Sequence, residues 1–392
     1  MITVRRKFST IVTLLTSTVT AVSSPLISFN DSLDVYFTGS SNLSWQSNLF
    51  SDSSDEVEDI LLTLSPGFEG VFGRGVSNAN LNFTTRYDIL RYDKSDEWDT
   101  QTFHAKLAGN YNAAKYFING LVSFDERQSS LRDAQVKGNL SESDESKLEV
   151  EGEYLFSPKF SFGSGIKFSK REYTGSQAIN YADRDSTILP VDLFYELTPK
   201  VDLSIGYQYT YTDIADVASN NADTAYSSDA HFVNIGARGD LLPKLTGNIK
   251  LGLRFIDSDF ANSSRDNSSL GLDGSLNWQT TPKLSNAITI SRDFGSTSNG
   301  TRIEESAFNI NSSLALSQQL RTGASLGYTL RDYLDQSRED GFLSLGLNAS
   351  YQVSDYCTVS SAYSYSKNNS DLAGGASDFD NNKVDINISL RY

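Results

Sequence analysis

Apolar and polar residues alternate with a period of two over most of this chain. In residues 201–211, Val, Leu, Ile and Tyr occupy the odd positions, while Asp, Ser, Gly, Gln and Thr occupy the even ones. Residues 245–255 and 384–392 follow the same pattern. A period of two is that of a β-strand, whose successive side chains point to opposite faces. Each run therefore predicts a strand with one apolar and one polar face.

Short turns and longer polar segments alternate between these runs. Four of the short turns contain Pro-Lys, in which proline withholds a donor from the strand ladder and lysine keeps the turn hydrated. The short turns lie near residues 72–75, 112–115, 157–159, 198–200, 242–244, 281–283, 317–320 and 354–356. The longer loops are 47–58, 93–98, 129–143, 174–185, 214–228, 259–266, 296–303, 335–340 and 368–380. Eight short turns and nine longer loops predict eighteen strands, with both chain ends on the short-turn side.

Alternation alone does not tell which face is buried, because a soluble β-protein hides its apolar face and a membrane barrel turns that face to lipid. Three features favour the membrane. The polar faces are rich in small residues suited to a wet lumen, the loops are short at one end and long at the other, and the last run ends on Tyr392. We therefore predict an all-β fold, a transmembrane antiparallel up-and-down β-barrel of about 18 strands, with short periplasmic turns and longer extracellular loops. Eighteen strands would enclose an aqueous channel. An exported β-helix or β-sandwich is the alternative.

Composition and the N-terminus place the chain outside the cytoplasm. Arg5, Arg6 and Lys7 precede a moderately apolar stretch, 11–22, that ends in small residues, as in a secretory signal. We expect residues 1–23 to be a signal peptide and residues 24–392 to form the barrel. No later stretch approaches the ~18 consecutive apolar residues of a spanning helix. A formal net charge of −16 makes nucleic acid a poor partner, and the single cysteine excludes an internal disulfide.

The polar faces of the predicted strands carry many charged residues. Folding about residues 157–159 places Glu149 opposite Lys167, and Glu145 opposite Arg171. Such cross-strand pairs contribute only ~0.2–1 kcal/mol each, so the plain interpretation is pairing within the wall. The functional interpretation is an electric field across a pore. The candidate lumen-facing residues are Lys106, Glu149, Glu151, Glu153, Lys167, Arg171, Arg238, Lys250, Arg254 and Arg331.

Catalytic and metal chemistry find little support in the sequence. His104 falls on the polar register and His231 on the apolar one, and neither lies near a nucleophile and an orienting group in sequence. We predict no enzyme activity, no cofactor and no metal site. The acidic segments 51–59 and 377–382 could attract divalent cations, but the second has Lys383 where an EF-hand loop needs glycine. We interpret both segments as solvated loops.

The segment "DILLTLSPGFEG" (59–70), followed by "LNFTTRYDILRYD" (81–93), resembles the outer-membrane β-barrel porin family linked to exopolysaccharide export genes. The sharpest shared motif is Ser65-Pro66-Gly67, and the terminal aromatic residue, here Tyr392, is also similar. The resemblance implies a barrel in the outer membrane of a Gram-negative bacterium, with polysaccharide passage as its narrower role. It carries over no residue that contacts a substrate.

These observations predict a porin that gives passive passage to hydrophilic solutes, with polysaccharide export as a more specific version. The alternative is a structural or adhesive barrel with a closed lumen and functional surface loops, and an enzyme barrel comes third. The expected partners are outer-membrane lipids and lipopolysaccharide, the barrel assembly machinery and polysaccharide. The assembly machinery would act through the last strand, with Tyr392 as the assembly signal, because an aromatic ring suits the membrane interface.

Overall fold

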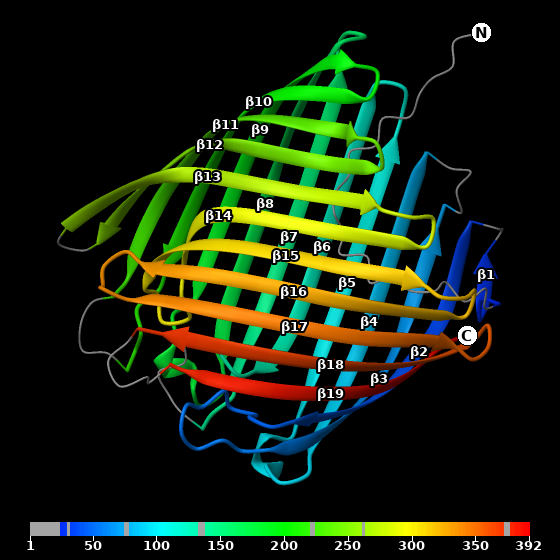
Figure 1. The fold of residues 1–392 in the computed structure, drawn as a ribbon, viewed down its shortest axis with the longest axis vertical. Coiled ribbons are helices and arrows are strands. Elements are labelled where there is room, and N and C mark those ends of the chain that lie inside the picture. The colour runs from blue at the N-terminus through cyan, green and yellow to red at the C-terminus, as the bar shows by residue number, and fades with distance from the viewer. Residues whose placement is uncertain are drawn as a thin grey trace.

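The computed structural model describes residues 24–29, 32–73, 78–131, 138–219, 224–260, 263–371 and 377–392. They form one closed antiparallel β-sheet of 19 strands, in which the short β1 is an addition to an eighteen-stranded barrel (Figure 1). The barrel strands are β2 (Leu33–Gln46), β3 (Asp59–Phe72), β4 (Ala79–Tyr92), β5 (Thr100–Asn112), β6 (Tyr116–Ser129), β7 (Ser141–Leu155), β8 (Phe160–Thr174), β9 (Arg184–Thr198), β10 (Val201–Ile214), β11 (Tyr226–Leu242), β12 (Leu245–Phe260), β13 (Ser263–Gln279), β14 (Leu284–Ser296), β15 (Arg302–Ala315), β16 (Leu320–Tyr333), β17 (Glu339–Gln352), β18 (Cys357–Ser370) and β19 (Phe379–Arg391). The predicted up-and-down barrel of about 18 strands is confirmed.

The first and last barrel strands close the wall. β19 pairs with β2 in antiparallel register, from Lys383 opposite Gln46 to Arg391 opposite Thr38. Tyr392 continues this ladder by exchanging backbone hydrogen bonds of 2.6 and 2.8 Å with Phe37. Beyond that point, β1 (Ile27–Phe29) pairs with residues 33–35 of β2. Both ends of the described chain therefore meet on β2. The predicted signal peptide, residues 1–23, lies outside the described residues.

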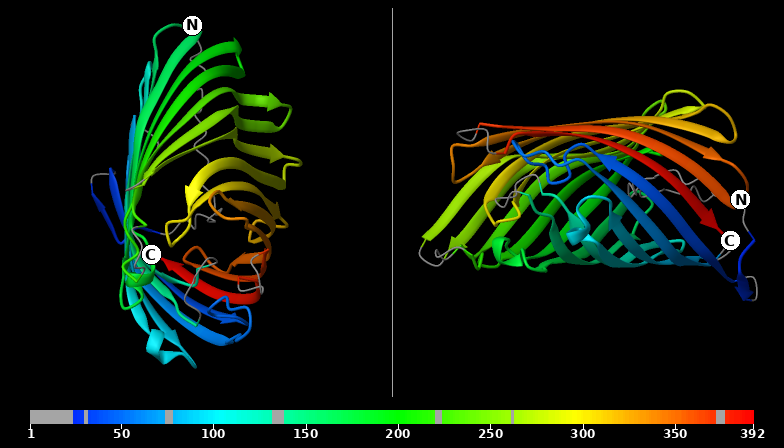
Figure 2. Two further views of the ribbon diagram at one scale, coloured as in Figure 1. Left: turned by 90° about the vertical axis from the view of Figure 1, so that its left-hand side faces the viewer. Right: turned by 90° about the horizontal axis from the view of Figure 1, so that it is seen from below.

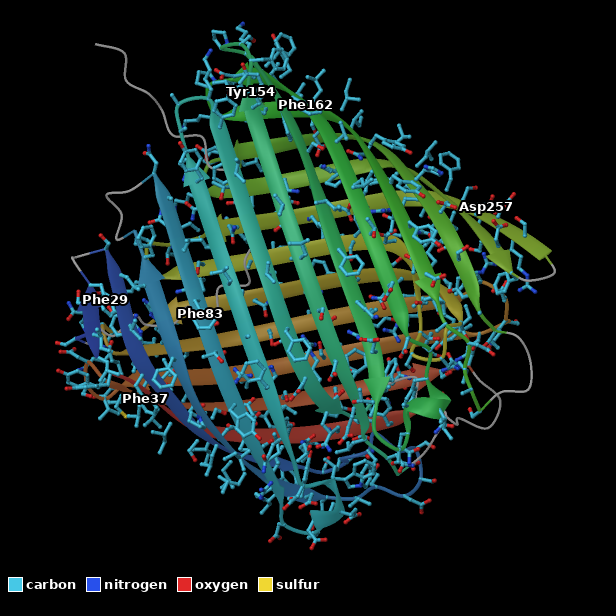
Figure 3. The ribbon with its side chains drawn as sticks, turned by 180° about the vertical axis from the view of Figure 1, so that it is seen from behind. Phe29, Phe37, Phe83, Tyr154, Phe162 and Asp257 are labelled. Atoms are coloured by element: carbon cyan, nitrogen blue, oxygen red, sulfur yellow. The ribbon has the colours of Figure 1, made fainter. Side chains whose placement is uncertain are left out.

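Apolar side chains cover the outer surface of the barrel. Ile205 and Ile235, which lie opposite each other on β10 and β11, are 67% and 65% exposed. In Figure 3, the labelled Phe37 and Phe83 lie on the outer side of their strands, and both are exposed. A soluble β-helix or β-sandwich would bury these residues, so the alternative fold is excluded. Among the described residues, no helix is long and apolar enough to cross a membrane.

The predicted loop 259–266 is wrong in its extent. β12 extends to Phe260, and β13 already begins at Ser263. Within this added part of the hairpin, Asp257 lies opposite Asp266. The outward register here is polar, with Asp257, Asp259 and Asp266, so it lacks the apolar signal used to delimit strands. A hairpin that extends beyond the lipid into water needs no apolar face. Asp257, labelled in Figure 3, lies on this projecting hairpin at the end of the barrel that carries the long loops.

The two walls of the barrel are held close together on one side. In the left view of Figure 2, the wall turns through the green strands at one end and through the paired red and blue strands at the other. On the green side, side chains of strands that are not neighbours are in contact, Arg238 of β11 with Glu153 of β7 and Lys250 of β12 with Asp192 of β9. We call β7–β14 the narrow sector, and β15–β19 with β2–β6 the wide sector. Loop residues cover the extracellular end of the narrow sector, where the Ala182 N–H donates to the Ser298 carbonyl over 2.9 Å. Ile214, only 2% exposed, belongs to the apolar cluster beneath this contact.

Candidate functional site

Charged residues from both walls of the narrow sector line a cavity of about 370 Å³ inside the barrel. They come from the polar register of β7, β8, β9, β11, β12 and β13, which faces inward because the apolar register faces lipid. Aromatic rings share this lining. The residues that matter here are Phe117, Glu149, Glu151, Glu153, Lys167, Asp192, Phe194, Arg238, Lys250 and Asp273.

Arg238 of β11 bridges the cavity to β7, a strand that is not its neighbour in the sheet. Its guanidinium donates to both carboxylate oxygens of Glu153, over 2.8 and 2.6 Å. It also donates to Asp202 over 3.1 and 3.2 Å, and it lies 3.5 Å from the centroid of the Phe194 ring. A planar guanidinium suits such bidentate recognition and also stacks on aromatic faces. This contact fixes the distance between the two walls.

Lys250 of β12 makes a second bridge, with its ammonium 2.7 Å from each carboxylate oxygen of Asp192 on β9. Farther toward the extracellular end, Arg254 pairs with Asp273 at 2.8 Å and with Asp293 at 2.9 Å. The guanidinium of Arg254 covers the ring of Phe232 at 3.8 Å. Three cations therefore tie the polar faces of the narrow sector together.

The ladder between β7 and β8 has the predicted register, with Glu149 opposite Lys167 and Glu145 opposite Arg171. Arg171 does pair with Glu145, at 3.1 Å. The ammonium of Lys167 instead lies 2.6 Å from Glu151, a diagonal neighbour on the same face. Diagonal partners lie within reach of long side chains. Glu149 consequently has no ion-pair or hydrogen-bond partner for its side chain in the described part of the structure.

The remaining candidates lie on the inner register of the wide sector, away from this cavity. Lys106 on β5 is exposed, and Arg331 on β16 pairs with Glu305 at 2.7 Å. Beside Lys106, the ring of His104 lies between two carboxylates, 2.9 Å from Asp125 and 3.2 Å from Asp88. The structure thus divides the predicted site residues into two groups. One group lines the bridged narrow sector, and the other, Lys106 and Arg331, lies across the lumen in the wide sector.

Sequence reasoning missed the aromatic residues beneath the arginines. Phe194 and Phe232 both lie on the inner register, Phe194 two residues from Asp192 and Phe232 two residues from Asn234. An aromatic residue on the polar register of a strand was therefore the available signal. The acidic segment 51–59 has a local role at its end, because the Asp59 carboxylate accepts the backbone N–H groups of Lys94 and Ser95 at 3.0 and 2.9 Å.

Comparison with known proteins gives one family. The family model described as "Putative beta-barrel porin 2" matches residues 40–392. A search of curated proteins finds no match. A BenF-like porin from Pseudomonas fluorescens is similar over 93% of this chain and 100% of its own, with a TM-score of 0.49 and 9% identity. OccAB4 from Acinetobacter baumannii is similar over 93% and 100%, with a TM-score of 0.47 and 10% identity. A bacterial polysaccharide outer membrane secretin is similar over 93% and 100%, with a TM-score of 0.38 and 11% identity.

Proposed function

From the premise that this chain belongs to the beta-barrel porin 2 family, we propose that hydrophilic solutes pass passively through its lumen. The family is an outer-membrane porin family of Gram-negative type and not an enzyme family. The observation that carries the proposal is the distribution of residue types. Apolar residues face lipid, while charged and small polar residues face the interior. A wall of this kind stabilises water and ions inside the barrel and offers them no apolar barrier.

We place the path for solutes in the wide sector. The narrow sector is bridged by Arg238 and Lys250 and covered at its extracellular end by the contact between Ala182 and Ser298. In the described part of the structure, the inner ion pairs of the wide sector span shorter distances along the wall. Arg331 pairs with Glu305 on the neighbouring strand, and Arg391 of β19 pairs with Glu69 of β3, only one strand farther on. Solutes crossing the wide sector would pass Lys106 and His104 on one wall and Arg331 on another.

Polysaccharide export is the narrower proposal. Its support is the combination of carboxylates and aromatic rings on the inner surface, since Phe117 of β6, the wide-sector strand next to the narrow sector, lies beside Glu151 and Glu153 of β7. Sugar hydroxyls donate hydrogen bonds to carboxylates, and the apolar faces of sugar rings pack on aromatic rings. A closed structural barrel is the second candidate. The bridges and the loop contact support this candidate because they obstruct the narrow sector. A closed barrel would require the wide sector to be obstructed as well.

Solute uptake by liposomes separates these candidates. The purified full-length protein is reconstituted into liposomes, which are then diluted into isotonic arabinose, maltose or a maltodextrin of about seven sugars. We expect swelling with arabinose that decreases with the size of the sugar. Fast entry of the maltodextrin would support polysaccharide passage. Swelling no faster than that of protein-free liposomes would contradict passive passage and support the closed barrel.

A further inference from the structure

The outer wall carries an apolar groove of about 600 Å³ near the short-turn end of β8–β12. Phe160 and Tyr195 form one side, with their ring centroids 5.2 Å apart, and Leu203 and Ile205 follow on the next strand. Ala237 lies between Leu203 and Ile249 in the register. Its small side chain leaves a depression in the outer surface that a larger side chain would fill. Its lining is almost wholly apolar, and the groove opens toward the region occupied by lipid.

The backbone is irregular beside this groove. Gly239 and Gly247 lie opposite each other on β11 and β12, with φ angles of +115° and +147°. A Cβ atom on Gly239 would lie 2.0 Å from the Lys200 carbonyl oxygen, so only glycine allows the close approach of the turn before β10 to β11. The register also shifts between Val201 and Asp202. Irregularities of this kind bend a strand and sharpen its twist. The groove is therefore built into the backbone.

Two lysines stand at the short-turn end of the groove. Lys159 directly precedes Phe160, and its side chain has no partner in the described part of the structure. Lys200 lies one hairpin away, which is about 10 Å for two strand spacings. Its ammonium is 3.6 Å from Asp240, with both side chains largely exposed. Glu196 is the other carboxylate nearby, and its N–H donates to the Lys159 carbonyl. Lys244, at the next turn, is engaged by the Thr280 carbonyl at 3.1 Å.

We propose that the groove binds one anionic phospholipid of the periplasmic leaflet, with an acyl chain against Ala237 and the phosphate between Lys159 and Lys200. The short turns of an outer-membrane barrel face the periplasm, where the leaflet consists of phospholipids. Charge complementarity selects the occupant, because Lys159 and Lys200 both stand at the short-turn end of the groove on a chain whose net charge is −16. Basic residues beside an apolar crevice bind anionic lipid headgroups in this way. The site does not depend on whether the lumen conducts.

Native mass spectrometry of the detergent-purified, full-length protein tests the apolar half of the site. The protein is incubated with an equimolar mixture of phosphatidylglycerol and phosphatidylcholine of identical chains. We expect one retained phosphatidylglycerol per barrel, and at least tenfold less retention in Ala237→Leu. Ala105→Leu is the matched control, since Ala105 also lies on the outer register, on β5, outside the groove. Equal retention in Ala237→Leu and Ala105→Leu would overturn the proposal.

A second pair of variants tests the charged half of the site. It keeps the proposal testable if Ala237→Leu does not fold. Lys159→Gln with Lys200→Gln should reduce the preference for phosphatidylglycerol over phosphatidylcholine at least fivefold. The control removes the same charge at two other short turns, Lys115→Gln with Lys283→Gln, and should retain the preference. Equal binding of the two lipids by the wild-type protein would overturn the proposal. A wild-type oligomer that Ala237→Leu converts to monomers would also overturn it, because a second copy would then fill the groove.

Discussion

Arg238 and Glu153 lie 85 residues apart in the sequence, yet the guanidinium of one and the carboxylate of the other form a two-point hydrogen-bonded pair with N–O distances of 2.6 and 2.8 Å. The two residues come from β11 and β7, which are not adjacent in the sheet. Their contact therefore crosses the interior. It fixes the separation of the walls in the narrow sector, which is why we place the proposed solute path in the wide sector.

Replacing Arg238 with methionine should destabilise the barrel and loosen the narrow sector. Hydrogen bonds to charged groups contribute about 1.5–3 kcal/mol each, and the variant leaves Glu153 and Asp202 without their shared cation, so we expect a loss of about 1–3 kcal/mol in the free energy of unfolding. Urea unfolding of the protein in lipid vesicles measures it. Arg321→Met, at an inner arginine with no partner in the described structure, is the control. Similar losses in both variants would show that the bridge contributes nothing of its own.

The assignment of faces predicts opposite consequences for two consecutive residues. Leu251→Arg places a charge on the lipid side, where it costs roughly 2–4 kcal/mol near the midplane. Lys250→Leu leaves the largely buried Asp192 carboxylate without its partner, but the cavity beside it is polar and the leucine adds no charge to the lipid face, so we expect a smaller cost. We expect the yield of folded protein in the outer membrane to fall much further for Leu251→Arg. A lower yield for Lys250→Leu would contradict the assignment.

Asp335, in the loop between β16 and β17, should make stability depend on pH at the acid end. Hydrogen bonds from Arg302, and then from Arg265, lower the pKa of Asp335 below its usual value. A lowered pKa in the folded state gives stability that is complete above the ordinary carboxyl pKa of about 4 and is lost as the pH falls through the folded value. Asp335→Asn removes this contribution and leaves Arg302, only 3% exposed, without its anion.

The measurement is the free energy of unfolding from pH 7 to pH 2.5. The wild-type protein should exceed Asp335→Asn by about 1–3 kcal/mol at pH 7, the range expected for charged hydrogen bonds, and the difference should shrink toward acid pH. Asp55→Asn, in the loop between β2 and β3, removes an exposed carboxylate and should follow the wild-type profile. A constant difference between wild type and Asp335→Asn at all pH values would argue against this ion pair as the cause.

Tyr392 tests the role that we propose for the last strand in assembly. Its backbone closes the ladder with Phe37, and its exposed ring lies 5.8 Å from that of Tyr356. Tyr392→Asp keeps the backbone bonds but places a charge at the membrane interface, where aromatic rings are favoured. We expect unassembled protein to accumulate in the periplasm, while Tyr392→Phe should assemble normally. Normal surface display of Tyr392→Asp would remove Tyr392 as an assembly signal.

Local patterns were sufficient to predict the strands and their number, because side-chain alternation and turn composition are properties of neighbouring residues. They also gave the register that places Glu149 opposite Lys167, which depends only on the turn between β7 and β8. The partner actually used by Lys167, Glu151, depends on side-chain reach and could not be read from the register. The bridge from Arg238 to Glu153 depends on the flattening of the whole barrel, which no short segment encodes. The extent of β12 and β13 was missed because the outward positions of this hairpin, 257, 259, 264, 266 and 268, are all polar.

Single-channel recording of the purified full-length protein in a planar bilayer tests the central claim most directly. We expect stable conductance steps and, under a salt gradient, a reversal potential that Lys106→Gln moves toward cations, because the exposed Lys106 ammonium lies on the inner register of the wide sector. The shift should shrink at 1 M salt, where the Debye length is about 3 Å. Glu58→Gln, in an extracellular loop, should leave the reversal potential unchanged. A folded wild-type barrel that shows no conductance steps would contradict passive passage.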